Sequence, residues 1–167
     1  QVERKCRRSG PNINSMDSPM TKIAVIGSNS FSGGDFVDLV LENGESQVMG
    51  IGRHPEKSFP FLSYPNTDPK FSFHQMDLNK DMPKILSLLD DFKPAFIVNF
   101  ASQSEVAPSW ENPDHWFQTN AVALARLVNH LKNKPYLKRY LHISTPEVYG
   151  SCSGQVTVTR VPNTGSS

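Results

Sequence analysis

Short apolar segments alternate with amphipathic segments from about residue 21 onward, and this alternation predicts both the elements and the fold. Five segments read as strands, at residues 22–26, 47–51, 71–76, 95–100 and 140–143. Apolar residues recur at helical spacing over residues 33–42, 82–92 and 114–132, and the Pro- and Trp-bearing stretch before the last helix reads as a loop. Strands alternating with helices predict an α/β fold, a right-handed, doubly wound parallel sheet.

The two ends of the chain lack this pattern. Residues 1–19 are polar and without periodicity, so we expect a disordered N-terminal extension. The predicted domain occupies residues 20–150, and residues 151–167 become polar again and form an irregular tail. We interpret the fold as truncated after about five strands.

Length, charge and cysteine content narrow the class of protein. A chain of 167 residues suits one domain, and a net charge of +1 gives no general attraction to nucleic acid. Cys6 and Cys152 have no metal-ligand spacing, so we expect no metal site and read both as free thiols of a reducing compartment. No apolar run has the length of a membrane span or of a signal-peptide core. We therefore expect a cytoplasmic protein with neither a membrane nor a nucleic acid as partner.

The segment IAVIGSNSFSGGDF predicts a sharp turn from a buried strand into a helix whose N-terminus faces a phosphate. Gly27 allows the tight turn, Gly33 lets the helix lie close to its strand, and Ser30 stands where the dinucleotide fingerprint has its middle glycine. We expect diphosphate oxygens against main-chain nitrogens between residues 27 and 34, which include those of Phe31 and Ser32. Turns of small residues are common between strand and helix, so the motif alone leaves a purely structural role open.

Small or polar residues follow every predicted strand, at the edge of the sheet where ligands bind in such folds. The candidates for cofactor binding there are Arg53, Asp77, Leu78, Ala101, Ser102, Gln103 and Ser144. Asp77 could bind an adenine amino group, or Asp77 or Asn79 could cap the following helix. Gly52 stands where NAD sites carry an acid, and Arg53 follows it, which favours NADP; the alternative for Arg53 is a solvated loop residue.

The segment HISTPEVYG after the last strand places Thr145 and Glu147 two residues apart. Thr145 could bind a substrate hydroxyl, and Glu147 could take a proton from a nearby carbon. The four residues Ser-Thr-Pro-Glu within this segment are also a common start of a helix, so a structural role for Thr145 and Glu147 is the alternative.

Taken together, the blocks IGSNSFSG, HQMDL, IVNFASQS, the helix with Thr119 and Asn120, and HISTPEVYG resemble the extended short-chain dehydrogenase/reductase family over about residues 20–150. The resemblance is nearest to the dTDP-glucose 4,6-dehydratases, whose motif reads Ser-Thr-Asp-Glu-Val-Tyr-Gly. It implies a Rossmann domain that binds NAD(P), with Asn120 among the cofactor-binding residues. It also implies a nucleotide-sugar substrate, and a homodimer is compatible with the family.

By this resemblance Thr145 would bind the sugar C4 hydroxyl and Glu147 would be the C5 base. Pro146 replaces the Asp that protonates the leaving hydroxyl, and it cannot donate a proton. The GDP-mannose 4,6-dehydratases are similar in having a non-acidic residue there, and they use NADP. The cofactor therefore stays open: Gly52 and Arg53 favour NADP, whereas the nearest resemblance favours NAD.

The family's oxidising pair, Tyr-x-x-x-Lys, is missing from this sequence, because no tyrosine has a lysine four positions later and no lysine follows Lys138. We therefore expect the NAD(P)-binding half of a nucleotide-sugar 4,6-dehydratase that is inactive alone. A fragment of a nucleotide-sugar epimerase and a non-catalytic dinucleotide-binding or sensor module are the alternatives. Glu147 favours the dehydratase, since epimerases need no C5 base.

Overall fold

A computed structural model of the chain describes residues 20–57, 68–150, 156 and 157. The predicted N-terminal extension lies outside the described residues, as does the predicted tail apart from residues 156 and 157. The two cysteines, Cys6 and Cys152, lie outside them as well.

Five parallel strands form one sheet in the order β3-β2-β1-β4-β5. Their bounds are Thr21–Ile26, Ser46–Gly52, Phe71–Gln75, Phe96–Asn99 and Arg139–His142 for β1 to β5. Each coincides with a predicted strand to within one residue at either end. The order runs outward in both directions from the contact between β1 and β4, which is where a doubly wound sheet reverses its direction of winding. The predicted fold class is confirmed.

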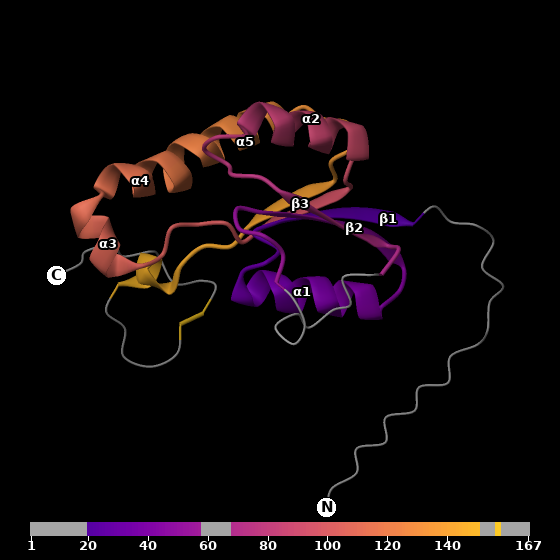
Figure 1. The fold of residues 1–167 in the computed structure, drawn as a ribbon, viewed down its shortest axis with the longest axis horizontal. Helices are drawn as coiled ribbons and strands as arrows, with labels where there is room; N and C mark the ends of the chain where they lie inside the picture. The colour runs from indigo at the N-terminus through magenta and orange to yellow at the C-terminus, as the bar shows by residue number, and fades with distance from the viewer. Residues whose placement is uncertain (1–19, 58–67, 151–155, 158–167) are drawn as a thin grey trace, which may run out of the picture.

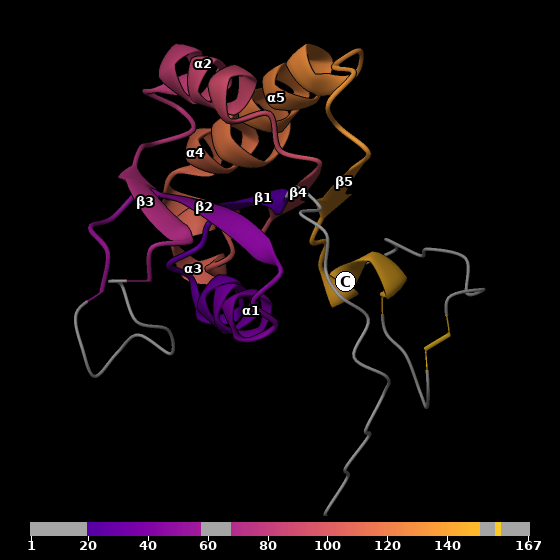
Figure 2. The ribbon, with the colours of Figure 1, turned by 90° about the vertical axis from the view of Figure 1, so that its right-hand side faces the viewer.

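The helices cover both faces of this sheet (Figures 1 and 2). Helix α1 (Phe31–Glu42) lies on one face, and α2 (Met82–Phe92) and α5 (Leu124–Leu131) lie on the other. The short helices α3 (Val106–Glu111) and α4 (Pro113–Phe117) continue from the α5 side toward the carboxyl edge of the sheet. The topology thus leaves that edge to loops, which supply the candidate site.

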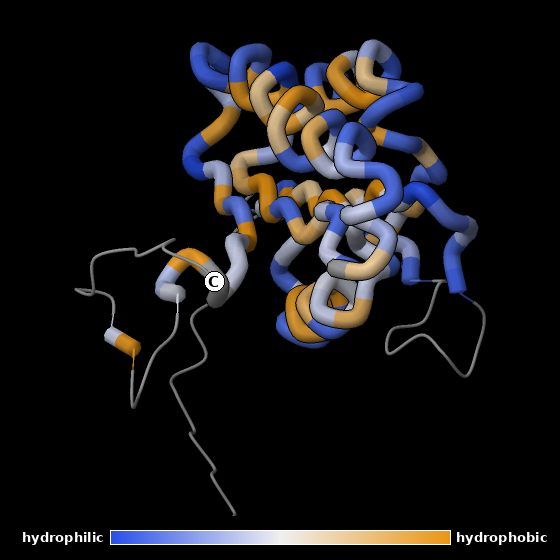
Figure 3. The backbone as a smooth tube through the Cα atoms, turned by 90° about the vertical axis from the view of Figure 1, so that its left-hand side faces the viewer, coloured by the Kyte–Doolittle hydropathy of each residue, from blue (hydrophilic) through white to orange (hydrophobic). Residues whose placement is uncertain are grey.

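Each face of the sheet has its own apolar core because successive strand residues point to opposite sides. Val25 and Val48 pack against α1 through Val37 and Val40, all nearly inaccessible to solvent. The larger core lies on the opposite face, where strand residues meet the inner sides of α2 and α5. Its buried members are Ala24, Ile26, Met49, Ile51, Ile97, Met82, Ile85, Leu89, Ala123, Leu127 and Leu131. Figure 3 shows the apolar strand segments between helices whose outer turns are hydrophilic.

On the α5 side one prediction is wrong and one is confirmed with an added detail. The stretch read as a loop contains α3, a six-residue helix that tolerates Pro108 because proline in a first turn loses no intrahelical bond. The predicted helix over residues 114–132 is confirmed as a helical stretch without a break, in which the π-helical turn η1 (Gln118–Ala123) lies between α4 and α5. Neither a six-residue helix nor one extra residue per turn disturbs an apolar pattern enough to be read from sequence.

The predicted cap of α2 is also wrong, because Asp81 occupies the N-cap rather than Asp77 or Asn79. Pro83 lies in the first turn, where its fixed φ favours helix initiation without a side-chain cap bond. Asp77 instead organises the preceding turn, since its Oδ1 accepts a hydrogen bond of 2.8 Å from the amide of Asn79.

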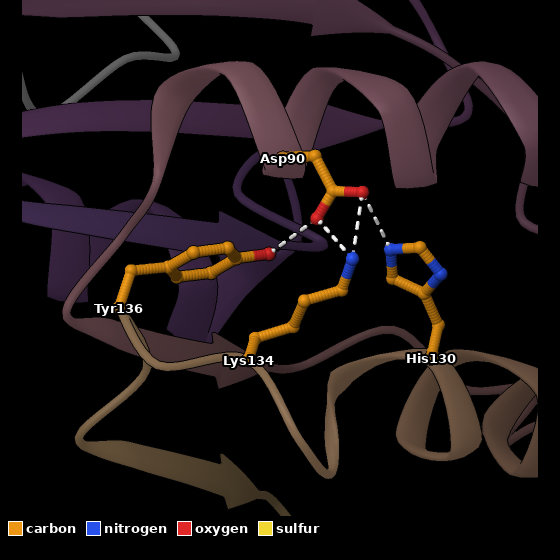
Figure 4. A network of polar contacts seen from close by, with 4 residues as sticks. All are labelled: Asp90, His130, Lys134 and Tyr136. Carbon is orange, nitrogen blue, oxygen red and sulfur yellow. Dashed lines mark hydrogen bonds and ion pairs between the residues drawn. The ribbon is translucent and has the colours of Figure 1, made fainter.

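At the opposite, amino-terminal edge of the sheet, a polar cluster ties the end of α2 to the end of α5 (Figure 4). The carboxylate of Asp90 on α2 accepts hydrogen bonds from Lys134 and Tyr136 and contacts His130 on α5, at 2.9, 2.8 and 2.9 Å. The Lys134 ammonium, with help from Tyr136 and His130, lowers the pKa of Asp90 to about 2. The cluster therefore fixes the helix pair that covers the larger core.

Candidate functional site

The loops after β1 and β4 meet at backbone distance in the crevice where the sheet reverses its winding. Gly27 has a φ of +80°, and a Cβ added there would lie 2.7 Å from the amide nitrogen of Ala101. A side chain at position 27 is therefore excluded both by its backbone conformation and by the loop after β4. The predicted role of Gly27 in the tight turn agrees with this geometry.

Helix α1 starts directly from this turn. A Cβ at Gly33 would lie 2.1 Å from the carbonyl oxygen of Gly27, so only glycine allows the helix to come this close to its strand. Ser30, in the place of the middle glycine, is the N-cap, and its Oγ accepts a hydrogen bond of 3.1 Å from the Gly33 amide. Its side chain points along the first turn, and the amides of Phe31 and Ser32 remain there for an external acceptor.

A pocket of about 280 Å³ opens at the carboxyl edge, between the ends of β1, β2, β3 and β4. Eight of the predicted cofactor-binding residues line it: Gly27, Ser30, Arg53, Asp77, Leu78, Ala101, Ser102 and Gln103. Gly33 lies below it in the packing of α1, and neither Phe31, which is 84% exposed, nor Ser32 belongs to its lining. The structure thus brings together in one cavity most of the residues that the sequence predicted separately.

The rim of this pocket after β2 carries basic side chains. Arg53 and His54 are exposed and in contact, with Arg53 Nε donating to His54 Nε2 at 3.3 Å. Gln75 at the end of β3 donates to the carbonyl of Arg53 at 3.3 Å, and Lys57 also lines the pocket. This rim can attract an anionic group, with Asp77 as the acidic residue of the lining.

The loop after β3 is held by the π-helical turn. Asn79 Nδ2 donates to Thr119 Oγ1 at 2.8 Å, and both residues line the pocket. The next residue, Asn120, fixes the loop after β4: its Oδ1 accepts from the Gln103 amide at 2.8 Å and its Nδ2 donates to the Gln103 carbonyl at 2.9 Å. Two adjacent residues of η1 therefore hold two different loops of the pocket. π-Helical turns are frequent at functional sites.

A second cavity of about 510 Å³ adjoins the first and shares Ser102 and Gln103 with it. Its lining includes three further predicted site residues, Asn120, Ser144 and Thr145. The two cavities together follow the edge of the sheet from β3 to β5, with Ser102 and Gln103 in the lining of both. Glu147 lies in the single 3-10 turn η2 (Pro146–Tyr149), and its side chain lies outside the described part of the structure.

His142 and Trp116 also line the second cavity, and Asn99 stands behind His142. Asn99 is 2% exposed, and its Oδ1 accepts from the Ala101 amide at 2.9 Å. Its Nδ2 lies 3.0 Å from the Tyr140 hydroxyl and 3.3 Å from His142 Nδ1. Burial raises the pKa of Tyr140 above its ordinary value, although the bond to Asn99 acts in the opposite sense. This buried amide therefore orients the end of β5 relative to the loop after β4.

Sequence reasoning missed Asn29, Asn79 and His142 as parts of the site. Asn79 was considered only as a helix cap, and Asn29 looked like a spacer within the glycine turn. The signal that could have found them is their position, because each lies within four residues of the carboxyl end of a strand. Among the described residues no group of three acidic, histidine or cysteine side chains could hold a metal ion. No helix in that part of the chain is both long and apolar enough to cross a bilayer.

Comparisons with known proteins place the chain in a family. The sequence profile described as GDP-mannose 4,6 dehydratase matches residues 25–163. A GDP-mannose 4,6-dehydratase of Yersinia enterocolitica is 30% identical in an alignment of 143 residues that covers 78% of this chain and 37% of that protein. A dTDP-glucose 4,6-dehydratase of Haemophilus influenzae is 26% identical, over 80% of this chain and 42% of that protein. The chain thus spans about two-fifths of the length of these curated relatives.

Solved structures show the same fold in longer chains. A dTDP-glucose 4,6-dehydratase of Bacillus anthracis in complex with NAD has a TM-score of 0.70 at 20% identity, covering 86% of this chain and 44% of that one. A UDP-glucuronic acid 4-epimerase of Bacillus cereus, with UDP-glucuronic acid and NAD, has a TM-score of 0.70 at 26% identity, covering 86% and 46%. The resemblance inferred from the motif blocks is confirmed for the N-terminal part of such enzymes. On its fold and its profile match together, the chain belongs to the GDP-mannose 4,6-dehydratase family.

Proposed function

We propose that this chain is the dinucleotide-binding part of a nucleotide-sugar 4,6-dehydratase and that the edge of the sheet from β3 to β5 takes a nicotinamide dinucleotide. The observation that carries the proposal is that two cavities lie along the same edge of the sheet and share Ser102 and Gln103 in their linings. A dinucleotide is an elongated molecule with two ring systems joined by a diphosphate, and it needs a groove that crosses the point where the winding reverses.

The residues fit such a molecule. The close approach of Gly27 and Gly33 to neighbouring backbone leaves the first turn of α1 open to a diphosphate, which the free amides and the helix dipole favour. The adenosine end would lie between the loops after β2 and β3, with Asp77 as acceptor for the adenine amino group. The nicotinamide end would lie in the second cavity near Ser144 and Asn120.

NADP is the proposed preference. The carboxylate that would bind a ribose 2′-hydroxyl is absent at Gly52, and Arg53 and His54 form the adjacent rim of the pocket. The NAD named with the solved relatives belongs to those proteins. It supports a nicotinamide dinucleotide here without deciding between the two forms.

The dinucleotide, when bound, would accept a hydride from the sugar and return it. Thr145, which is exposed in the second cavity, would hold the C4 hydroxyl through its own hydroxyl group. Glu147 would remove the C5 proton as general base, while the C6 hydroxyl leaves as water. Pro146 cannot protonate that hydroxyl, so its proton must come from another group. The oxidising Tyr-x-x-x-Lys pair is absent from this sequence, and the polypeptide alone is therefore proposed to bind cofactor without completing dehydration.

The test has two arms. Calorimetric titration of the chain with NADPH and NADH should show binding of both, with NADPH tighter. Incubation with GDP-mannose or dTDP-glucose and either oxidised cofactor should yield no 4-keto-6-deoxy sugar by mass spectrometry. Absence of binding by either nucleotide would contradict the cofactor site, and formation of the keto sugar would contradict the proposed inactivity.

A nucleotide-sugar epimerase is the second candidate, because 4-epimerases are among the similar structures. The dehydratase is preferred because Glu147 follows Thr145 and because the matching profile is that of a dehydratase family. The cofactor titration does not separate the two candidates. The product formed by a longer protein that carries the oxidising pair would separate them, because a dehydratase yields a 4-keto-6-deoxy sugar and an epimerase yields the C4 epimer.

A further inference from the structure

Asn29 joins the diphosphate turn to the loop that follows β2. Its Nδ2 donates to the carbonyl oxygen of His54 at 2.9 Å and to that of Pro55 at 3.3 Å. The side chain is half-buried and lines the first cavity beside Arg53 and His54. The position of the basic rim is therefore set by one amide that comes from a different loop.

The same amide occupies the space next to Gly52. A Cβ added at position 52 would lie 2.4 Å from Asn29 Oδ1, 2.7 Å from Cγ and 3.0 Å from Nδ2. All three of the nearest atoms belong to Asn29, and position 52 has a negative φ that any residue can adopt. Asn29 in this conformation and a side chain at position 52 therefore exclude each other, and no other residue in the described part of the chain comes as close to that Cβ position.

Position 52 is the last residue of β2. A carboxylate at this position would hold the ribose 2′-hydroxyl and repel a 2′-phosphate. Because Asn29 fills this space, a carboxylate can be placed there only if the Asn29 side chain moves and gives up its hydrogen bonds to His54 and Pro55. The same residue fixes the backbone that carries Arg53 and His54, which face the region that a 2′-phosphate would enter. Asn29 thus opposes a carboxylate at position 52, which would select NAD, and it holds the backbone that carries the cationic Arg53.

We infer that Asn29 is a positioning residue that determines the preference of this site for a 2′-phosphorylated dinucleotide. The inference rests on the proposed function, which it deepens by naming the residue that sets the selectivity. It requires that Asn29 and Gly52 act as a coupled pair.

The experiment measures the dissociation constants of NADPH and NADH for the 167-residue chain and its variants by calorimetric titration. Asn29→Ala removes both hydrogen bonds, and we expect about fivefold weaker NADPH binding with NADH within about twofold, because NADH does not use the basic rim. Asn43→Ala is the matched control, since Asn43 makes the same kind of bond, of 3.0 Å to the Leu39 carbonyl, at the distant end of α1. It should leave the ratio of the two constants unchanged.

The coupling is tested with an acid at position 52. Gly52→Asp alone should weaken binding of both nucleotides, since the new side chain collides with Asn29. Asn29→Ala combined with Gly52→Asp should regain NADH binding and reverse the preference by at least about tenfold, the effect of one well-placed hydrogen bond and one repelled phosphate. Melting temperatures of all variants report folding. If Gly52→Asp fails to fold, Asn29→Ala and the double variant still carry the test.

The results separate the inference from the proposed function. A wild-type chain that binds neither nucleotide overturns both. A wild-type chain that binds NADPH more tightly, together with an Asn29→Ala variant of unchanged ratio, overturns only the role of Asn29. An effect of Gly52→Asp that is the same with and without Asn29→Ala overturns the coupling.

Discussion

The carboxylate of Asp90 accepts a hydrogen bond of 2.8 Å from the hydroxyl of Tyr136, which fixes the end of α2 to the turn that follows α5. Lys134 and His130 bind the same carboxylate, so one acidic side chain is bound by three donors from the end of α5 and the turn that follows it. This contact lies where α2 and α5 end, before β4 and β5 begin, and therefore at the edge of the sheet opposite the candidate site. It stabilises the fold, and its charge makes that stabilisation depend on pH.

Asp90→Asn should lower the free energy of unfolding at pH 7 by about 1 kcal/mol, the size of a hydrogen-bonded ion pair that solvent partly screens. The pKa of Asp90 is lowered to about 2 from its ordinary 3.8, so the folded state binds this proton less readily than the unfolded state. The contribution is therefore complete above about pH 4 and is lost as the pH falls toward 2. Urea unfolding of both proteins between pH 7 and 2 should show the difference shrinking over that window.

Asp114→Asn is the control for this prediction, because Asp114 is 81% exposed and lies 3.8 Å from its only ion-pair partner in the described part of the chain, His115. It should change stability by less than about 0.5 kcal/mol at every pH. A difference for Asp90→Asn that stays constant from pH 7 to 2 would mean that its charge does not stabilise the helix pair.

Two serines of the glycine turn should respond in opposite ways to alanine. Ser28 Oγ is fully buried beside Gly50 and has no hydrogen-bond partner among the described residues, so Ser28→Ala should leave stability unchanged or raise it. Ser30 caps α1, and Ser30→Ala should cost about 1 kcal/mol. Chemical denaturation of the two variants measures both effects. Equal losses at the two positions would mean that the Ser28 hydroxyl has a partner after all.

The two glycines at the start of α1 provide a similar pair. A Cβ at Gly33 would lie 2.1 Å from the Gly27 carbonyl, whereas at Gly34 the nearest atom, the Ser28 carbonyl oxygen, is 3.7 Å away. Gly33→Ala should displace the helix, lower stability by more than about 3 kcal/mol and abolish nucleotide binding. Gly34→Ala should raise stability by up to about 1 kcal/mol, since alanine favours the helix. Thermal unfolding and NADPH titration of both variants check this, and a tolerated Gly33→Ala would contradict the close packing.

The parts of this molecule that sequence predicted well depend on periodic burial. The strands at Ile23 and Ile97 lie in continuous apolar runs because helices cover both faces of the sheet, and this leaves a clear local signal. Gly27 and Gly33 were predictable for a similar reason, since the turn between strand and helix has a fixed chemistry. Fold class and the edge that carries the site follow from these features.

The parts that sequence did not predict depend on contacts between distant loops. Nothing local to Asn29 shows that its amide reaches the carbonyl of His54, 25 positions away. Asn79 and Thr119 are 40 positions apart, and the π-helical turn that aligns Thr119 has no compositional mark. Such side-chain-to-loop contacts need the assembled sheet, and they are the contacts that give the pocket its shape.

Asn120 offers the most direct test of those contacts. Its amide makes both a donated and an accepted hydrogen bond to the backbone of Gln103, which lines both cavities. Asn120→Ala should lower the free energy of unfolding by about 1–3 kcal/mol, because two partly buried backbone groups lose their partner. Nucleotide binding should weaken by about tenfold or more, since the loop that joins the two cavities is no longer fixed.

Asn129→Ala is the matched control on the same helical stretch, where the side chain accepts a hydrogen bond of 2.7 Å from the exposed Lys132. It should change neither stability nor affinity by a measurable amount. If Asn120→Ala lost stability but kept full affinity for both nucleotides, the loop after β4 would not form part of the binding site. The dinucleotide would then have to lie on the β2 and β3 side alone, and the second cavity would have no part in binding it.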